Sequence, residues 1–419
     1  MRILHTSDLH VGRTLGNLSL LEDQAAVLDQ IADIASQEKV DVVVIAGDIY
    51  DRAVPSAEAV ALVDRFLVRL VVHDKRKVLA IAGNHDSPER IGFTANILKE
   101  LDLHLRGTLD DLSPVVIDDD DGPVAFHLLP YAEVAIARQH ARRTTGAPDA
   151  PADDADDAEA PGAIRDHQAA MSHLVAASLA AGPAVARRVA VAHAFVTGGE
   201  ASDTERDLSV GGASQVAAGT FGAFAYVALG HLHRAQRMGA DRVRYSGSPL
   251  KYSLKEADHA KLVTIVDLDR AGQVTTRTVP VSTPRDVRIV TGTIDQILAA
   301  ASKDDRRTDL VGARLTDTHT VPEPATRLRT WYPNLVGVEY TNLAIGPGTG
   351  AGAVDPSRSP LDLFTDFYKD MTGTDLDDED RQIVAAAVRS AIATQKEERS
   401  EEHTSELQSQ STISYAVFC

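Results

Sequence analysis

The chain has 419 residues, of which 44% are hydrophobic, and it carries a formal net charge of −19 at pH 7. A chain of this length can bury a large core and is expected to form two or three domains. The only cysteine is Cys419, which excludes disulfides and thiolate metal sites. No apolar run reaches the roughly 20 residues of a membrane span and no signal peptide is recognisable, so we expect a cytoplasmic protein without membrane association.

The acidic charge is unevenly distributed. Acidic residues cluster at 118–121, 149–157 and 375–380. The net charge argues against binding nucleic acid through the overall field of the protein. Because the acidic residues are concentrated in clusters, the functional face of the protein can still be neutral or basic. The net charge therefore weakens the case for a nucleic-acid substrate but does not exclude one.

The first part of the chain alternates between strand and helix patterns. Three apolar runs predict strands, at Arg2–Ser7, Val40–Ala46 and Lys77–Ala82, and two segments with helical spacing lie between them, at Leu20–Ser36 and Ala57–Val72. This order predicts right-handed crossovers and an inner parallel sheet. Further strands are predicted at Val124–Leu129, Arg188–Ala192, Ala225–Leu229, Val243–Ser246 and Lys261–Asp267. We assign 1–283 to this first α/β domain, interrupted by a disordered acidic insertion at 144–163.

A small α+β domain is predicted at 284–344. Its expected elements are a strand, a helix and two further strands, at Val287–Val290, Ile294–Ala301, Leu310–Leu315 and Leu335–Tyr340. A Gly- and Pro-rich linker at 345–360 separates it from two helices within 361–398, Leu361–Met371 and Glu379–Gln395. These helices are predicted either to dock onto a partner or to pack on the chain's own core. Residues 399–419, which begin RSEEHTSELQS, look like a translated sequencing adapter and are left out of the fold.

Five short segments with histidine or carboxylate side chains each follow a predicted strand. They supply seven candidate metal ligands: Asp8, His10, Asp48, Asn84, His193, His231 and His233. Loops after the strands of an open α/β sheet meet at one edge, where a shared Asp48 could bridge two cations about 3.5–4 Å apart. One such residue after a strand is more often a cap, but seven at successive strand ends favour a metal site. Oxygen and imidazole ligands suit two divalent cations, foremost Mn²⁺, with iron, zinc or Mg²⁺ as alternatives.

The motifs D-x-H, G-D, G-N-H-D, a single His and G-H-x-H stand here in the order found in the calcineurin-like metallophosphoesterase superfamily, which the chain resembles. The resemblance implies a four-layer sandwich of two mixed β-sheets flanked by helices. It implies one ion held by Asp8, His10, Asp48 and His233, and another held by Asp48, Asn84, His193 and His231. It further implies that His85 contacts the scissile phosphate or protonates the leaving oxygen, and that Asp86 orients the imidazole of His85.

More specific segments resemble the SbcD nuclease-subunit family. They are MRILHTSDLHVGRTL at 1–15, SDTERDLSVGG at 202–212, YVALGHLHRAQ at 226–236 and YSGSPLKYS at 245–253. The resemblance implies a two-metal endonuclease and 3′→5′ double-strand exonuclease in DNA repair, recombination and replication. It implies an SbcC-type ATPase partner whose coiled coil docks on the post-linker helices, a small domain that caps DNA, and a homodimer within a heterotetramer.

Arginines follow most of the predicted metal loops, at Arg13, Arg52, Arg90 and Arg234. Such cations suit a polyanionic backbone that extends past the scissile bond, although ordinary surface ion pairs explain any one of them equally well. Two other functions stay open. One is a phosphodiesterase or nucleotidase for small substrates, and the other, less favoured because every ligand position is intact, is a scaffold with a dead site.

Overall fold

The protein is described by a computed structural model over residues 1–145, 164–201, 215–341, 359–372, 375–378 and 380–388. The chain divides into two compact units, Met1–Thr341 and Asn342–Cys419. In the described part of the chain, no helix combines the length and the apolar character needed to cross a membrane.

The first six-stranded sheet has the order β16-β15-β1-β4-β5-β6. Its strands are β1 (Arg2–Thr6), β4 (Val42–Ile45), β5 (Lys77–Ile81), β6 (Leu103–Arg106), β15 (Leu262–Leu268) and β16 (Val274–Pro280). Strands β1, β4, β5 and β6 are parallel, whereas β15 and β16 run antiparallel at one edge. The continuous apolar run VVVI of β4 is buried throughout, as expected for a strand covered on both faces. The predicted inner parallel sheet is therefore confirmed, with strand ends shifted by one or two residues.

The second six-stranded sheet has the order β13-β14-β12-β9-β8-β7. Its strands are β7 (Val115–Asp119), β8 (Gly122–Leu129), β9 (Arg188–His193), β12 (Tyr226–Gly230), β13 (Gln236–Met238) and β14 (Ala240–Tyr245). The four central strands are parallel, and β7 and β13 pair antiparallel at the edges. Strands β6, β7, β13 and β16 were not among the predicted elements.

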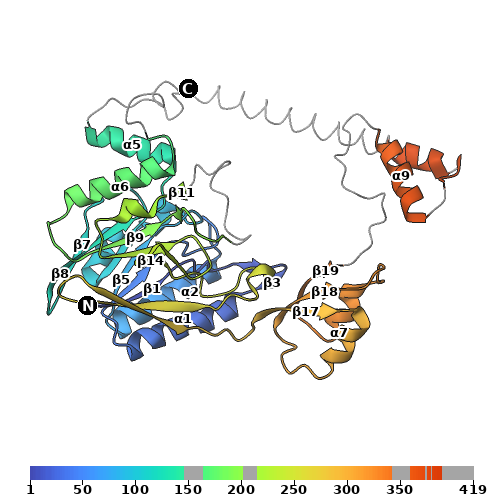
Figure 1. Ribbon diagram of the computed structural model, residues 1–419, viewed down its shortest axis with the longest axis horizontal. Helices are drawn as coiled ribbons and strands as arrows, with labels where there is room; N and C mark the ends of the chain where they lie inside the picture. The colour runs from blue at the N-terminus through green and yellow to red at the C-terminus, as the bar shows by residue number, and fades with distance from the viewer. Residues whose placement is uncertain (146–163, 202–214, 342–358, 373–374, 379, 389–419) are drawn as a thin grey trace, which may run out of the picture. The chain divides into compact units, whose positions relative to one another are not determined.

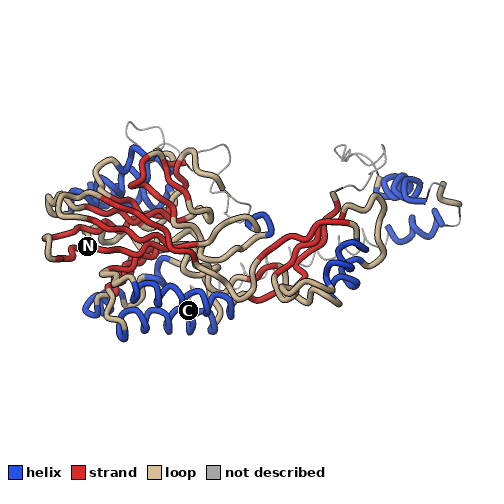
Figure 2. Tube along the Cα trace, turned by 60° about the horizontal axis from the view of Figure 1, so that its bottom comes forward, coloured by secondary structure: helices blue, strands red, loops and turns tan. Residues whose placement is uncertain are grey.

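The two sheets pack face to face between two layers of helices. A buried cluster that includes Ile3, Val44, Phe126 and Val191 joins the sheets. Helices α1 (Leu21–Gln37) and α2 (Ala57–Val68) cover the first sheet, and α6 (His167–Ala181), beside α5 (Val134–Thr145), covers the second, as Figure 1 shows. In Figure 2 the strands lie between the helical layers. The predicted four-layer sandwich of two mixed sheets is confirmed.

Short elements complete this domain. They are β2 (Thr14–Leu15), β3 (Leu18–Ser19), the π-helix η1 (Arg69–His73), α3 (Pro88–Ile91), α4 (Ala95–Leu98), η2 (Lys99–Leu101), β10 (Phe195–Val196), β11 (Gln215–Val216), η5 (Ala218–Phe221) and η6 (Leu254–Glu256). The predicted helix Ala57–Val72 therefore continues from α2 into a π-helical turn.

A small parallel sheet follows the sandwich. It contains β17 (Val287–Gly292), β18 (Leu310–Leu315) and β19 (Leu335–Tyr340), with helices α7 (Ile294–Ala301) and α8 (Pro324–Arg329). Thr293 and Gln296 form a capping box at the start of α7, which fixes where the helix begins. The sheet has its own core, yet it belongs to the same compact unit as the sandwich. The domain boundaries at 283 and 344 stay predictions.

The second unit contains α9 (Pro360–Thr372) and helical turns at 380–388, so the predicted helix Leu361–Met371 is present. The first residues of the predicted insertion, Thr144 and Thr145, end α5 instead. The rest of the insertion, most of the linker, residues 389–398 and the tail at 399–419 lie outside the described residues.

Candidate metal centre

The predicted ligands follow strands of both sheets, at the ends of β1, β4, β5, β9 and β12. Four of them have a positive φ, namely Asp8 (53°), His10 (42°), Asp48 (50°) and His231 (108°). Residues other than glycine rarely adopt this backbone conformation, and it persists only where the surrounding structure enforces it. Backbone bonds between the loops supply that restraint, because Asp8 N donates to Gly47 O at 3.0 Å and His10 N donates to Asp48 O at 2.9 Å.

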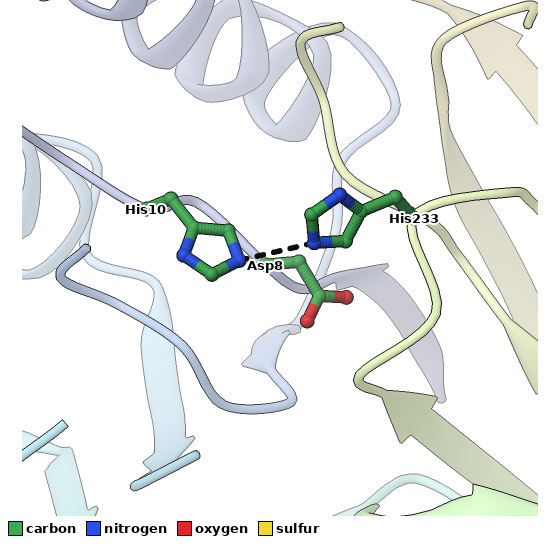
Figure 3. Close-up of side chains that lie close together, drawn as sticks. All are labelled: Asp8, His10 and His233. Atoms are coloured by element: carbon green, nitrogen blue, oxygen red, sulfur yellow. Dashed lines mark hydrogen bonds between the residues drawn. The ribbon is translucent and has the colours of Figure 1, made fainter. Parts of the chain in front are cut away.

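One group of ligands joins the two sheets. Figure 3 shows the ring of His10, from the loop after β1, facing that of His233, from the loop after β12, with Asp8 of the first loop beside them. The Nε2 atoms of His10 and His233 are 3.1 Å apart, and a ligand atom from each of the three residues lies within 4.8 Å of the others. His10 Nε2 is also 3.5 Å from Asp48 Oδ2. Atoms that share an ion at about 2.0–2.2 Å stand at separations of this order.

A second group forms around Asn84. Its Oδ1 lies 2.9 Å from His193 Nε2 and 3.2 Å from His231 Nδ1. His193 Nε2 is 3.6 Å from Asp48 Oδ2, the same oxygen that approaches His10. One carboxylate oxygen thus approaches a histidine of each group.

The protonation of these imidazoles tests whether cations fit. His193 Nδ1 lies 2.9 Å from the carbonyl oxygen of Ala46, which can only accept, so Nδ1 carries the proton and Nε2 presents a lone pair. That lone pair faces the amide oxygen of Asn84, which is also an acceptor. Burial lowers the pKa of His193, as it does for His10 and His231, and keeps the rings neutral. Converging acceptors without a proton between them suit divalent cations.

The predicted role of Asp86 requires a correction. Its carboxylate accepts from three backbone N–H groups, those of Ile49 at 3.0 Å, Tyr50 at 2.9 Å and Gly83 at 2.9 Å. The imidazole of His85 instead donates from Nδ1 to the carbonyl oxygen of Asp51, at 2.9 Å. Asp86 therefore fixes the two loops to each other and does not orient His85. Burial and then the charge of Asp48 raise the pKa of Asp86 to about 7, against these three donors.

The four arginines differ in their surroundings. Arg13 donates to Asp51 at 2.9 Å and lies over the ring of Tyr252, and Arg234 pairs with Glu200. The side chain of Arg52 is 78% exposed, although its Nε is 3.7 Å from Asp51, and Arg90 is exposed on α3. Arg52 and Arg90 are thus exposed cations, while Arg13 and Arg234 lie closer to an acidic partner than Arg52 does.

One buried acidic residue beside the site was not predicted. Glu256 Oε1 lies 3.2 Å from His233 Nδ1, and its side chain is fully buried. Burial raises the pKa of Glu256, but the bond from His233 and the charge of Lys261 outweigh burial and hold the pKa below its ordinary value. Glu256 stands 23 residues from His233 in a segment without a recognisable motif, so no signal in the sequence pointed to it.

Comparison with known protein families supports the interpretation of these loops as a metallophosphoesterase site. Residues 1–142 match the calcineurin-like phosphoesterase family, and residues 283–372 match the SbcD C-terminal family, described as the type 5 capsule protein repressor C-terminal domain. Two solved structures from Thermus thermophilus are distantly similar. One is titled as TT1561, with 16% identity over 66% of this chain and 98% of that chain and a TM-score of 0.35. The other, a hypothetical protein, has 13% identity over 67% of this chain and 100% of that chain and a TM-score of 0.32.

The two family matches agree with the fold and with the motifs. Together the matches account for the metal loops up to Asp86 and for the small parallel sheet with α9. Residues 1–142 thus carry a calcineurin-like phosphoesterase domain, which indicates a metal-dependent phosphoester hydrolase, and the SbcD C-terminal domain at 283–372 supports an SbcD-type member of the metallophosphoesterase superfamily.

Proposed function

We propose that the protein is a two-metal DNA nuclease that acts as a 3′→5′ double-strand exonuclease and as an endonuclease in DNA repair, recombination and replication. The observation that carries the proposal is the position of Asp48 Oδ2, 3.5 Å from His10 Nε2 and 3.6 Å from His193 Nε2. The match of 283–372 to the SbcD C-terminal family supports DNA as the substrate. The oxygen and imidazole donors favour Mn²⁺, with Mg²⁺ as the alternative.

The side chains divide the work of hydrolysis. Divalent cations bound by the two ligand groups would neutralise phosphate oxygens and lower the pKa of a bound water. His85 is held by its Nδ1–H bond to Asp51 O, so Nε2 is the ring atom that exchanges a proton with the leaving oxygen. The backbone N–H of His85 donates to Asp48 Oδ1 at 2.9 Å, which ties the proposed acid to the proposed bridging carboxylate. Arg52 and Arg90 are the cations placed to contact the DNA backbone beyond the scissile bond.

Partner binding is proposed for two surfaces. The match to the SbcD C-terminal family includes α9, which we assign to an SbcC-type ATPase with a coiled coil. A second copy of the chain is proposed to cover an apolar stripe at four-residue spacing, formed by Phe93 (75% exposed), Ile97 (69%) and Leu101 (59%). Lys99 and Glu100 beside the stripe carry opposite charges that an antiparallel pairing of two copies would match.

A substrate comparison tests the proposal. Wild-type protein and Asp48→Asn are assayed with Mn²⁺ on linear duplex DNA, on hairpin DNA and on a chromogenic phosphodiester, with and without the ATPase partner. We expect cleavage of DNA that requires Mn²⁺ and is lost in Asp48→Asn. If the wild-type protein turns over the chromogenic ester and leaves every DNA substrate intact under all these conditions, the nuclease assignment is wrong and a small-substrate phosphodiesterase takes its place.

A further inference from the structure

The segment YSGSPLKYS at 245–253 lies against the predicted metal loops, although the sequence motif alone indicates no role for its residues. Tyr245 OH donates to the carbonyl oxygen of Ala194, next to His193, at 2.6 Å. Ser246 Oγ is 3.0 Å from Ser7 Oγ, which itself donates to Asp8 Oδ2 at 2.5 Å. The segment thus supports ligand loops of both groups, and it leads directly into the turn η6 that carries Glu256.

Glu256 fixes the tautomer of His233. Its Oε2 accepts from the Nζ of Lys261 at 2.6 Å and its Oε1 faces His233 Nδ1 at 3.2 Å, so Nδ1 is the donor of that bond and carries the proton. The lone pair of His233 is then on Nε2, the atom that lies 3.1 Å from His10 Nε2. A carboxylate behind a histidine ligand sets the orientation of the ring and increases its basicity toward a metal.

Lys261 holds Glu256 in place. Its Nζ donates to Glu256 Oε2 at 2.6 Å, to the carbonyl oxygen of His233 at 3.0 Å and to Ser248 Oγ at 2.8 Å. The lysine and glutamate side chains are 4% and 0% exposed. An ion pair this deeply buried costs more in desolvation than a well-packed apolar pair, so its presence calls for a reason other than stability. The same lysine binds both the backbone of the ligand and the carboxylate behind its ring.

We propose that Glu256, anchored by Lys261, is the positioning residue that directs Nε2 of His233 toward one of the two cations. The carboxylate fixes the proton on Nδ1 and the angle of the ring, and the lysine fixes the carboxylate and the backbone of His233. The inference rests on the metal-binding part of the proposed function and is independent of DNA as the substrate.

The test measures metal binding rather than hydrolysis. Mn²⁺ is titrated into wild-type protein, Glu256→Gln and Glu256→Asp, with calorimetry for the affinities and electron paramagnetic resonance for the number of bound ions. Glu256→Gln keeps the length of the side chain and loses its charge, whereas Glu256→Asp keeps the charge and loses reach. We expect one binding step to weaken by about 10–100-fold in Glu256→Gln and by less in Glu256→Asp. The other step, which depends on Asn84, His193 and His231, keeps its affinity.

The control is a second ion pair at a distance from the ligands. Asp119 pairs with Arg187 at 2.6 Å, and Asp119→Asn should bind both ions as the wild type does. If Glu256→Gln does not fold, Glu256→Asp and the double variant Glu256→Gln with Lys261→Met, which removes both charges, carry the test. A folded variant that binds two ions with wild-type affinities, or that loses both steps equally, overturns the inference. Absence of Mn²⁺ binding by the wild type would instead overturn the proposed function.

Discussion

Gly83 is the position where one added methyl group would disturb the proposed bridging ligand most directly. A Cβ at this residue would lie 2.2 Å from Asp48 Oδ1, 2.4 Å from Asp48 N and 2.8 Å from Asp48 Cγ. Real Cβ atoms do not approach other atoms within 3.0 Å, and one of these contacts is with the backbone. Gly83→Ala therefore requires the two loops to separate by roughly 1 Å at Asp48.

The cost has two parts of different size. Overpacking of this kind destabilises a fold by about 1–3 kcal/mol, which lowers the melting temperature by about 2–4 °C per kcal/mol in a domain of 150–250 residues. Asp48 approaches both ligand groups, so its displacement is expected to weaken the binding of both ions. We expect each Mn²⁺ affinity to fall by at least about tenfold, which corresponds to 1.4 kcal/mol per ion. Calorimetric titration with Mn²⁺ measures this loss, and thermal melting in chelator measures the loss of stability.

Gly219 provides the matched control, because a Cβ there meets no atom within 4 Å and the residue has no positive φ. Gly219→Ala should bind both ions and melt as the wild type does. If Gly83→Ala also binds both ions with wild-type affinity, the close approach of the two loops does not position Asp48, and the geometric reasoning for the bridge is refuted.

Three other predictions use separate parts of the molecule. His85→Gln should bind both ions normally and lose about 10²–10⁴-fold in DNA hydrolysis; unchanged hydrolysis would remove His85 from the reaction. Ile97→Asp should convert a dimer into a monomer in light scattering, whereas Val116→Asp, at another exposed site on β7 (44% exposed, against 69% for Ile97), should not, and a wild-type monomer would contradict the dimer. Burial lowers the pKa of His5 from 6.5 to about 3, so between these two pH values the unfolded chain takes up a proton at this residue and the folded protein does not. The contribution of His5 to stability is therefore complete above pH 6.5 and is lost as the pH falls toward 3. Between pH 7 and 5, urea unfolding in chelator should show a loss about 2 kcal/mol smaller in His5→Gln than in the wild type; equal losses would contradict the burial argument.

The elements that the sequence predicted are those whose pattern is local. The run VVVI of β4 is buried on both faces and is recognisable without its neighbours. Helix α6 was missed because the alanines within it leave no clear apolar stripe. Strand β7 was missed because it ends within an acidic cluster, and distant cations help to hold that end: Asp119 pairs with Arg187, 68 positions away, and with the N-terminal ammonium group of Met1.

The same division applies to the site. The seven predicted ligands come together because their motifs follow strands, and the order of strands in the sheets brings those strand ends to one place. The residues behind the ligands were not predictable, because their contacts are with backbone atoms or with distant residues. Asp86 lies in the motif G-N-H-D and was expected to bind an imidazole, yet backbone N–H groups from two loops surround it. Its oxygens accept from those three N–H groups, and the His85 imidazole bonds to the carbonyl oxygen of Asp51 instead.

These contacts explain how the protein tolerates a strained group of ligands. A left-handed backbone at a residue other than glycine costs about 1–3 kcal/mol, and Asp8, His10, Asp48 and His231 all adopt it. Bonds between the loops, including His231 N to Asp8 Oδ1 at 2.8 Å, prevent each residue from relaxing alone. Strain in one loop is therefore relieved only if the others move as well. The fold thereby holds acceptor atoms with converging lone pairs 2.9–3.6 Å apart. If the loops could move independently, these atoms would repel one another and separate.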